Sequence, residues 1–185
     1  MCGISGIAGK NWNTNLLHSM TKIQSHRGPD KEGHFINVNQ TIGLGHTRLS
    51  IIDLTDTGNC PMSDSSGNLT LVFNGEIYNY LELKQELANY PFQTTSDTEV
   101  ILASYITWGE KCVDKFIGMF SFAIWDEREQ TLFCSRDRLG IKPFFYHFGN
   151  NTLYFASEIK AILACDIPCK PNWKQWSTYL TTGYY

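Results

Sequence analysis

The sequence predicts an α+β protein, and three observations carry this prediction. Strand-like runs dominate the chain and fall into two blocks, with helical patterns clustered between them. The runs of the second block follow one another about every ten residues, which favours antiparallel hairpins over β–α–β units. The chain has 185 residues, of which 42% are hydrophobic and 14% aromatic, and this is enough to build the core of one domain. We therefore expect layered sheets with helices outside them.

The first block of strands begins at the N-terminus. Residues 3–8 are apolar and rich in glycine, and residues 69–74 are rich in β-forming side chains. The second of these runs reaches Asn74-Gly75, which is the strongest local signal for a two-residue hairpin turn. The other predicted strands are 33–38 and 42–52 in the first block, and 118–125, 131–136, 144–148 and 152–156 in the second.

One helical pattern lies early in the chain, at residues 14–24, and two short ones lie near its end. In the early helix, apolar side chains recur at helical spacing, which predicts that they share the face toward the core. Of the late patterns, one starts near Ser157 or Glu158 and the other follows Pro171. The apolar positions of the early helix are Leu17, Met20 and Ile23.

Two further helices carry signals at their N-termini. Ser96 followed three residues later by Glu99 is a capping box, in which each side chain is expected to accept a backbone N–H of the other residue. Asn79 followed by Glu82 resembles the same motif. The helices that these signals open are predicted at 80–89 and 97–108.

Composition excludes several classes of function. The formal net charge is −3 and no run of like charges occurs, which argues against electrostatic binding to nucleic acid or to an anionic membrane. No apolar run approaches the roughly 20 residues of a membrane helix, and the N-terminus lacks the basic start of a signal peptide. Six scattered cysteines do not form a disulfide framework, so we expect reduced thiols in the cytoplasm. The five histidines show no paired ligand spacing, so no metal site is predicted.

Cys2 is the most informative residue for chemistry. Removal of the initiator methionine would leave it with a thiol and an α-amine on one residue. The α-amine has a reference pKa of about 7.7–8.0, so near neutral pH it can accept the thiol proton, directly or through a water. This is the logic of a nucleophile activated by the terminal amine. On its own, a cysteine at position 2 favours the interpretation without function.

Three other positions each allow a structural and a functional interpretation. Asn74-Gly75 suits a hairpin turn, and it also suits an oxyanion hole made of a side-chain amide and a backbone N–H. Arg48 lies in an apolar strand, either facing water or clamping a carboxylate in a bidentate way. Asp97 lies in the first turn of a capped helix, either stabilising the helix dipole or receiving an ammonium group.

Nine short segments carry a further signal, in order through nearly the whole chain: residues 1–6, 26–30, 48–54, 73–79, 96–100, 118–123, 136–137, 140–143 and 156–160. Together they resemble the glutamine amidotransferase domain of the asparagine synthetases, which is of the class II, N-terminal-nucleophile type. The start of the chain and Asn-Gly are shared with related transferases of amino-sugar and purine biosynthesis. The Arg-Leu-Ser-Ile-Ile-Asp and Gly-Ile-Lys-Pro stretches are closer to the asparagine synthetase type.

The resemblance implies an αββα sandwich, in which two antiparallel sheets lie between helical layers. It implies that Cys2 is the nucleophile and that Asn74 and Gly75 form the oxyanion hole. It further implies that Arg48 holds the α-carboxylate of glutamine. The α-ammonium group would be bound by Glu76 and Asp97, and backbone groups of Leu49, Ser50, Ile51 and Ile52 would help to line the pocket.

The implied reaction is the hydrolysis of glutamine to glutamate and ammonia by a domain at residues 1–170, without a cofactor. Residues 171–185 would begin the connection to a C-terminal synthetase domain, which would use ATP and Mg²⁺ to amidate aspartate. A homodimer is left open. Two alternatives remain, namely an amidotransferase acting on another carboxylate, such as a sugar acid or a secondary metabolite, and a non-catalytic assembly domain.

Overall fold

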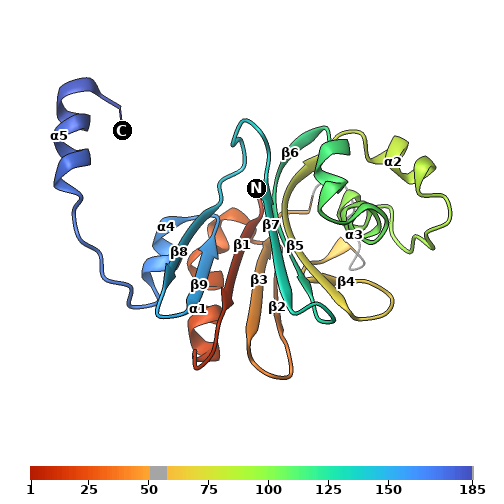
Figure 1. The fold of residues 1–185 in the computed structure, drawn as a ribbon, viewed down its shortest axis with the longest axis horizontal. Helices are drawn as coiled ribbons and strands as arrows, with labels where there is room; N and C mark the ends of the chain where they lie inside the picture. Colours follow the sequence, from red (N-terminus) through yellow and green to blue (C-terminus); the bar gives the residue numbers. More distant parts are fainter. Residues whose placement is uncertain (51–57, 185) are drawn as a thin grey trace.

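Four layers make up the body of the molecule (Figure 1). The computed structural model describes residues 1–50 and 58–184. Two antiparallel sheets pack face to face, and helices cover the outer face of each sheet. The predicted α+β class and the αββα order of layers are therefore confirmed.

The first sheet has the strand order β2-β3-β1-β9-β8, and every neighbouring pair is antiparallel. Helices α1 (Thr14–Ile23) and α4 (Ile159–Leu163) pack on its outer face, with the short 3₁₀ helix η1 (Ser25–Arg27) after α1. The strands are β1 (Gly3–Ala8), β2 (Lys31–Ile36), β3 (Ile42–Arg48), β8 (Phe145–Gly149) and β9 (Thr152–Ala156).

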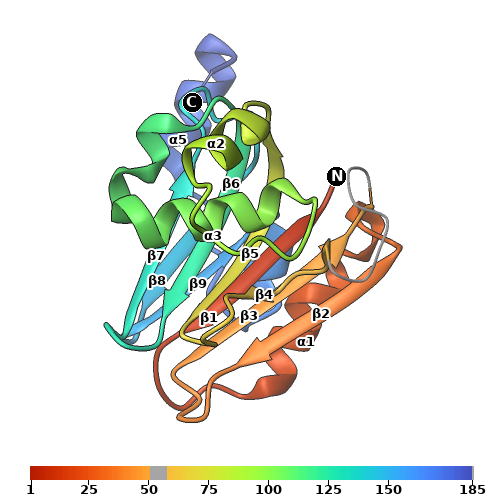
Figure 2. The same cartoon turned by 90° about the vertical axis from the view of Figure 1, so that its right-hand side faces the viewer.

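The second sheet has the order β4-β5-β6-β7 and is also antiparallel. Its outer face carries α2 and α3, and both figures place these helices on the side of the molecule away from α1 (Figures 1 and 2). The elements are β4 (Met62–Ser63), β5 (Leu69–Ile77), α2 (Tyr80–Glu86), α3 (Asp97–Trp108), the 3₁₀ helix η3 (Gly109–Lys115), β6 (Gly118–Asp126) and β7 (Thr131–Arg136).

Side-chain alternation along the strands produces three apolar layers. In β5, Leu71 and Phe73 face the α2/α3 side, whereas Val72 between them faces the other sheet. In β1, Ile4 faces the other sheet and Ile7 faces α1. The last helix, α5 (Trp173–Thr182), lies apart from these layers and buries none of its residues (Figure 1).

The predicted turn at Asn74-Gly75 is wrong, because β5 continues through both residues to Ile77. Asn74 lies opposite Ser121 of β6, and Gly75 lies opposite Phe120. A β-carbon on Gly75 would lie 2.3 Å from the carbonyl oxygen of Met119, so the close approach of β6 requires glycine here. Gly75 therefore serves strand packing, although the local preference of Asn-Gly is for a turn.

Three other features differ from the sequence prediction or lie partly outside the described residues. Ile23 was predicted to face the core, but it is 37% exposed, whereas Leu17 and Met20 are fully buried. The short strand β4 had no sequence signal. The predicted strand 42–52 ends at Arg48 within the described residues, and positions 51 and 52 lie outside them.

Both predicted capping boxes differ in the structure. Ser96 caps α3 as predicted and accepts from the N–H of Thr98 over 3.1 Å. Glu99 does not return the bond to Ser96; its carboxylate accepts from the backbone of Gln93 and Thr94. Asn79 makes no side-chain cap at α2, and its amide bridges instead to the segment that leads into β6.

Candidate active site

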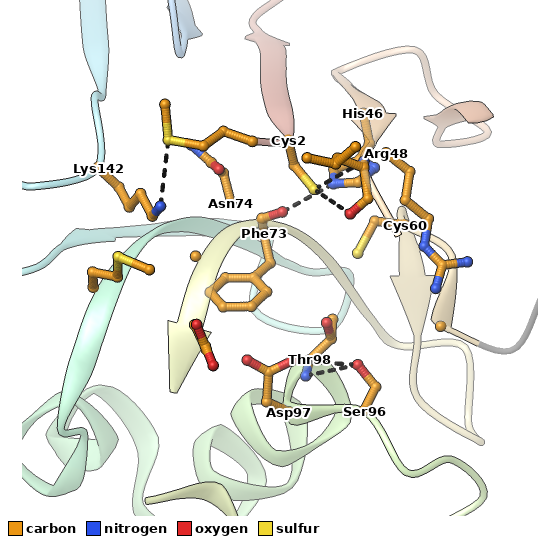
Figure 3. Close-up of a pocket in the computed structure, with 16 residues that line it drawn as sticks. Cys2, His46, Arg48, Cys60, Phe73, Asn74, Ser96, Asp97, Thr98 and Lys142 are labelled. Atoms are coloured by element: carbon orange, nitrogen blue, oxygen red, sulfur yellow. Dashed lines mark hydrogen bonds between the residues drawn. The ribbon is translucent and has the colours of Figure 1, made fainter. Parts of the chain in front are cut away.

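A pocket opens where the N-terminus meets both sheets (Figure 3). Gly3 at the start of β1 lies opposite Thr47 near the end of β3, so this antiparallel register brings Cys2 beside Arg48 and Leu49. The second sheet adds the C-terminal half of β5, and α3 adds its first turn. The described lining residues are Met1, Cys2, His46, Arg48, Leu49, Gly58, Cys60, Phe73, Asn74, Gly75, Glu76, Ser96, Asp97, Thr98, Met119 and Lys142.

The thiol of Cys2 is held against the backbone of Leu49. Its Sγ lies 3.4 Å from the amide nitrogen of Leu49, which donates to it, and 3.7 Å from the carbonyl oxygen of the same residue. Burial raises the pKa of the Cys2 thiol, while the Leu49 N–H and nearby positive charges act in the opposite direction. All six cysteines of the chain are free, so this thiol is available for chemistry.

Met1 is attached to Cys2 in this structure, so the nitrogen of Cys2 is a peptide nitrogen. The Met1 side chain lines the pocket, and its Sδ lies 3.5 Å from Nζ of Lys142, which is itself 6% exposed. Sequence analysis did not assign a role to Lys142, whose positive charge acts to lower the pKa of Cys2. The structure thus represents the chain before any removal of methionine.

Asn74 presents a buried donor that no described residue of the protein uses. The residue is 1% exposed, and its Nδ2 has no hydrogen-bond partner among the described residues. Leaving a buried amide donor unpaired costs about 1–3 kcal/mol, so such a group calls for a ligand acceptor or a functional reason. Since Asn74 and Cys2 line the same pocket, this donor is available to an oxygen atom near the thiol (Figure 3).

Glu76 and Asp97 place two carboxylates in the same pocket. Asp97 is 4% exposed, and its Oδ2 accepts from the N–H of Ile77 over 3.0 Å. Burial raises the pKa of Asp97, and the negative charge of Glu76 raises it further. Within the described part of the chain, neither carboxylate forms an ion pair. A bound cation would therefore relieve an existing electrostatic cost.

Arg48 supplies positive charge at the end of β3. It is 7% exposed, and its Nη1 donates to Oδ1 of Asn59 over 2.6 Å. The four residues that follow Arg48 were predicted to line the pocket, and Leu49 does so. Ser50 uses its N–H to donate to Oδ2 of Asp30 over 2.8 Å. Ile51 and Ile52 lie outside the described residues.

His46 is a lining residue for which sequence analysis proposed no role. Its Nε2 lies 2.9 Å from the carbonyl oxygen of Phe73, and this contact joins β3 of one sheet to β5 of the other. Burial lowers the pKa of His46 to about 4, so the ring is neutral and Nε2 must carry the proton that it donates. The peptide that leads into Asn74 is thereby fixed. The sequence signal for His46 was its position two residues before Arg48, which places both side chains on the same face of the strand.

The arrangement suits an amino acid whose side chain ends in a carbonyl group. The arginine complements a carboxylate, and the two acidic residues complement an ammonium group. The thiol can attack a carbonyl carbon, and the Asn74 amide can bind the oxygen as it becomes negative.

Comparisons with known proteins agree with this chemistry. The family model of the glutamine amidotransferase domain matches residues 1–185. The chain is 43% identical over 182 residues to asparagine synthetase (glutamine-hydrolyzing) 2 of Bacillus subtilis, which covers 95% of this chain and 24% of that protein. It is 41% identical over 158 residues to the amidase chry2 of Gibberella zeae, with coverage of 85% and 23%. The chain thus spans about a quarter of these curated relatives.

A solved structure shares the fold. Glutamine phosphoribosylpyrophosphate amidotransferase from Bacillus subtilis, solved with ADP and GMP, superposes with a TM-score of 0.77 at 22% identity. The match covers 89% of this chain and 44% of that one. Separately, among the described residues there is no helix with the length and apolar character that crossing a membrane requires.

Proposed function

The chain belongs to the glutamine amidotransferase domain family, class II, and we propose that Cys2, once freed of Met1, is the nucleophile with which it hydrolyses glutamine. The observation that carries this proposal is the unpartnered Nδ2 of Asn74 in the pocket that also holds the Cys2 thiol. A turn residue would have no reason to keep a buried donor free, whereas an oxyanion hole requires one.

In the proposed reaction, the α-amine of Cys2 takes the thiol proton and Sγ attacks the side-chain amide carbon of glutamine. The carbonyl oxygen becomes an oxyanion that accepts hydrogen bonds from Asn74 Nδ2 and the N–H of Gly75. The carbon–nitrogen bond then breaks, and the α-ammonium of Cys2 protonates the leaving nitrogen to give ammonia. Water attacks the resulting thioester, with the amine as base, and releases glutamate and the free thiol.

The remaining pocket charges account for substrate recognition in this proposal. Arg48 binds the α-carboxylate of glutamine, and Glu76 with Asp97 binds its α-ammonium group. Leu49 contributes to the pocket wall beside the thiol. Each charge of the zwitterion then meets an opposite charge, which positions the side-chain amide at the thiol.

We extend the proposal to the longer protein of which such domains form a part. Residues 1–170 are the glutaminase domain, and residues 171–185 begin the connection to an ATP- and Mg²⁺-dependent domain. That domain passes the ammonia to the side chain of aspartate. One alternative is that another carboxylate is the acceptor, and relatives of this domain do include a protein named as an amidase, at 41% identity. Assay of the full-length protein with aspartate and with other carboxylic acids, in the presence of ATP, distinguishes the two.

The direct test compares two cysteine variants. Cys2→Ala is expected to abolish glutamate release from glutamine while leaving the melting curve unchanged. Cys169→Ala, which removes an exposed thiol, is the matched control and is expected to retain full activity. Glutamate release by Cys2→Ala at the wild-type rate would rule out the proposed nucleophile.

A further inference from the structure

A cluster of three side chains outside the active site has the chemistry of a metal site. His18, Glu32 and His34 each offer a ligand atom, and these atoms all lie within 4.8 Å of one another. His18 is on α1, whereas Glu32 and His34 are on β2, the edge strand of the first sheet. None of the three lines the active-site pocket.

The fold brings these residues together for simple geometric reasons. Alternate residues of a strand share a face, so Glu32 and His34 point to the same side of β2 as Ile36, which packs against the α1 cluster. The neighbouring strand has Gly43 and Gly45 beneath α1, where β-carbons would meet Trp12 and Thr21. Because these glycines let α1 lie close to the sheet, His18 on the helix reaches the edge strand β2.

The distances are close to those that a metal ion requires. With metal–ligand bonds of about 2.0–2.1 Å, tetrahedral ligand atoms lie roughly 3.3 Å apart. Nε2 of His34 and Oε1 of Glu32 are already 3.4 Å apart. The rings of His18 and His34 have centroids 4.1 Å apart, and His18 is exposed, so a rotation of its side chain can bring its nitrogen to the ion.

His34 also offers a ring nitrogen that no hydrogen bond to a described residue occupies. Its Nε2 is shielded from solvent and has no hydrogen-bond partner among the described residues. A ring nitrogen of histidine without a hydrogen-bond partner can serve as a metal ligand.

We propose that His18, Glu32 and His34 form a binding site for a divalent transition-metal ion, for which Zn²⁺ is the probe. Two imidazoles and one carboxylate suit this class of ion, whereas Ca²⁺ and Mg²⁺ prefer sites made of oxygen atoms. Three protein ligands leave a coordination position for water or a fourth group. The bound ion joins α1 to the edge of the sheet and stabilises that contact.

Calorimetric titration with Zn²⁺ tests the site in the intact chain. We expect one ion per chain, bound with an affinity that falls about tenfold or more in His34→Ala and in Glu32→Gln. His147→Ala is the matched control, because His147 is also a half-buried strand histidine but lies on β8, and it is expected to bind Zn²⁺ normally.

Thiols are the main competing ligands, so a second readout identifies the donor atoms. In nuclear magnetic resonance spectra of histidine side chains, Zn²⁺ should shift the signals of His18 and His34 and leave that of His147 unchanged. Equal Zn²⁺ affinity in wild type, His34→Ala and Glu32→Gln would overturn the proposal and place the ion elsewhere, for example on Cys2 and Cys60. If the melting curve shows that His34→Ala does not fold, Glu32→Gln and the histidine signals decide the matter.

Discussion

Nε of Arg27 donates a hydrogen bond to the carbonyl oxygen of Cys2 over 2.9 Å. The same guanidinium reaches Oε1 of Glu158 with Nη1 over 3.1 Å, and Glu158 also pairs with His26 and Lys160. A residue so near the end of a chain frays unless it is tied down. The His26-Arg27 corner and the residue before α4 therefore hold the proposed nucleophile in place.

This cluster predicts an acid-sensitive contribution to stability. Burial alone raises the pKa of Glu158, but hydrogen bonds from Lys160, His26 and Arg27 outweigh burial and lower it from 4.5 to about 2. Because the folded pKa is depressed, the stabilisation is present above pH 4.5 and is lost as the pH falls toward about 2. Melting temperatures measured over this range should fall less steeply in Glu158→Gln than in wild type.

The control for this experiment is Glu86→Gln, which removes a carboxylate from an exposed ion pair with Lys115. We expect it to follow the wild-type dependence on pH, since exposed pairs contribute little. Parallel curves for wild type and Glu158→Gln would show that the cluster does not stabilise the fold through this carboxylate.

Removal of Met1 is predicted to switch on glutamine hydrolysis. While Met1 is attached, Cys2 has no free amine and the Met1 side chain lies in the pocket against Lys142. Treatment with a methionine aminopeptidase should therefore increase activity in proportion to the loss of one methionine by mass spectrometry. The activity of the trimmed enzyme should rise with pH over about pH 6 to 8, as the amine loses its proton. Equal activity of the trimmed and untrimmed chains would exclude the amine as the base.

Substrate recognition is predicted to depend on Arg48 and Asp97. Arg48→Ala should raise the KM for glutamine about tenfold or more, because a hydrogen bond to a charged group is worth roughly 1.5–3 kcal/mol. Asp97→Asn should act similarly, and its amide oxygen can still accept from Ile77, so folding is preserved. Arg128→Ala, which alters an exposed arginine between β6 and β7, serves as the control. A normal KM in both pocket variants means that glutamine binds elsewhere.

Asn74→Asp separates the oxyanion hole from a structural role. The substitution preserves size but replaces an amide donor with a carboxylate, which repels a developing negative charge. Turnover should fall about 10²-fold or more, while the binding of glutamine weakens much less, since the charge appears only in the transition state. Steady-state kinetics and a melting curve supply both readouts. The control is Asn150→Asp, at the exposed turn between β8 and β9, which should leave kcat unchanged. A near-normal kcat in Asn74→Asp would reject the catalytic role of Asn74.

Much of the local structure follows from the sequence by itself. The helix predicted at 97–108 has the same bounds in the structure, because Ser96 supplies a local cap and needs no distant partner. The two blocks of strands were also readable, since apolar and β-branched residues recur along them. Cys2 became a candidate because removal of Met1 would give it both a thiol and an α-amine, and the resemblance to class II amidotransferases assigned it the role of nucleophile.

The tertiary structure decided what local preference could not. Asn74-Gly75 prefers a turn in isolation, but pairing of β5 with β6 as far as Ile77 and Gly118 buries it within a strand. The sequence allows Glu99 to complete a capping box, but in the structure its carboxylate accepts from the backbone of Gln93 and Thr94. His18 and His34 show no ligand spacing along the chain, yet the packing of α1 on the sheet brings their rings together. For Glu99 the deciding partners are five and six residues away, in the loop before α3, and they replace the bond to Ser96 locally. For Asn74-Gly75 and for the two histidines the deciding partner is distant in sequence, so its energy enters only after the sheets and helices have packed.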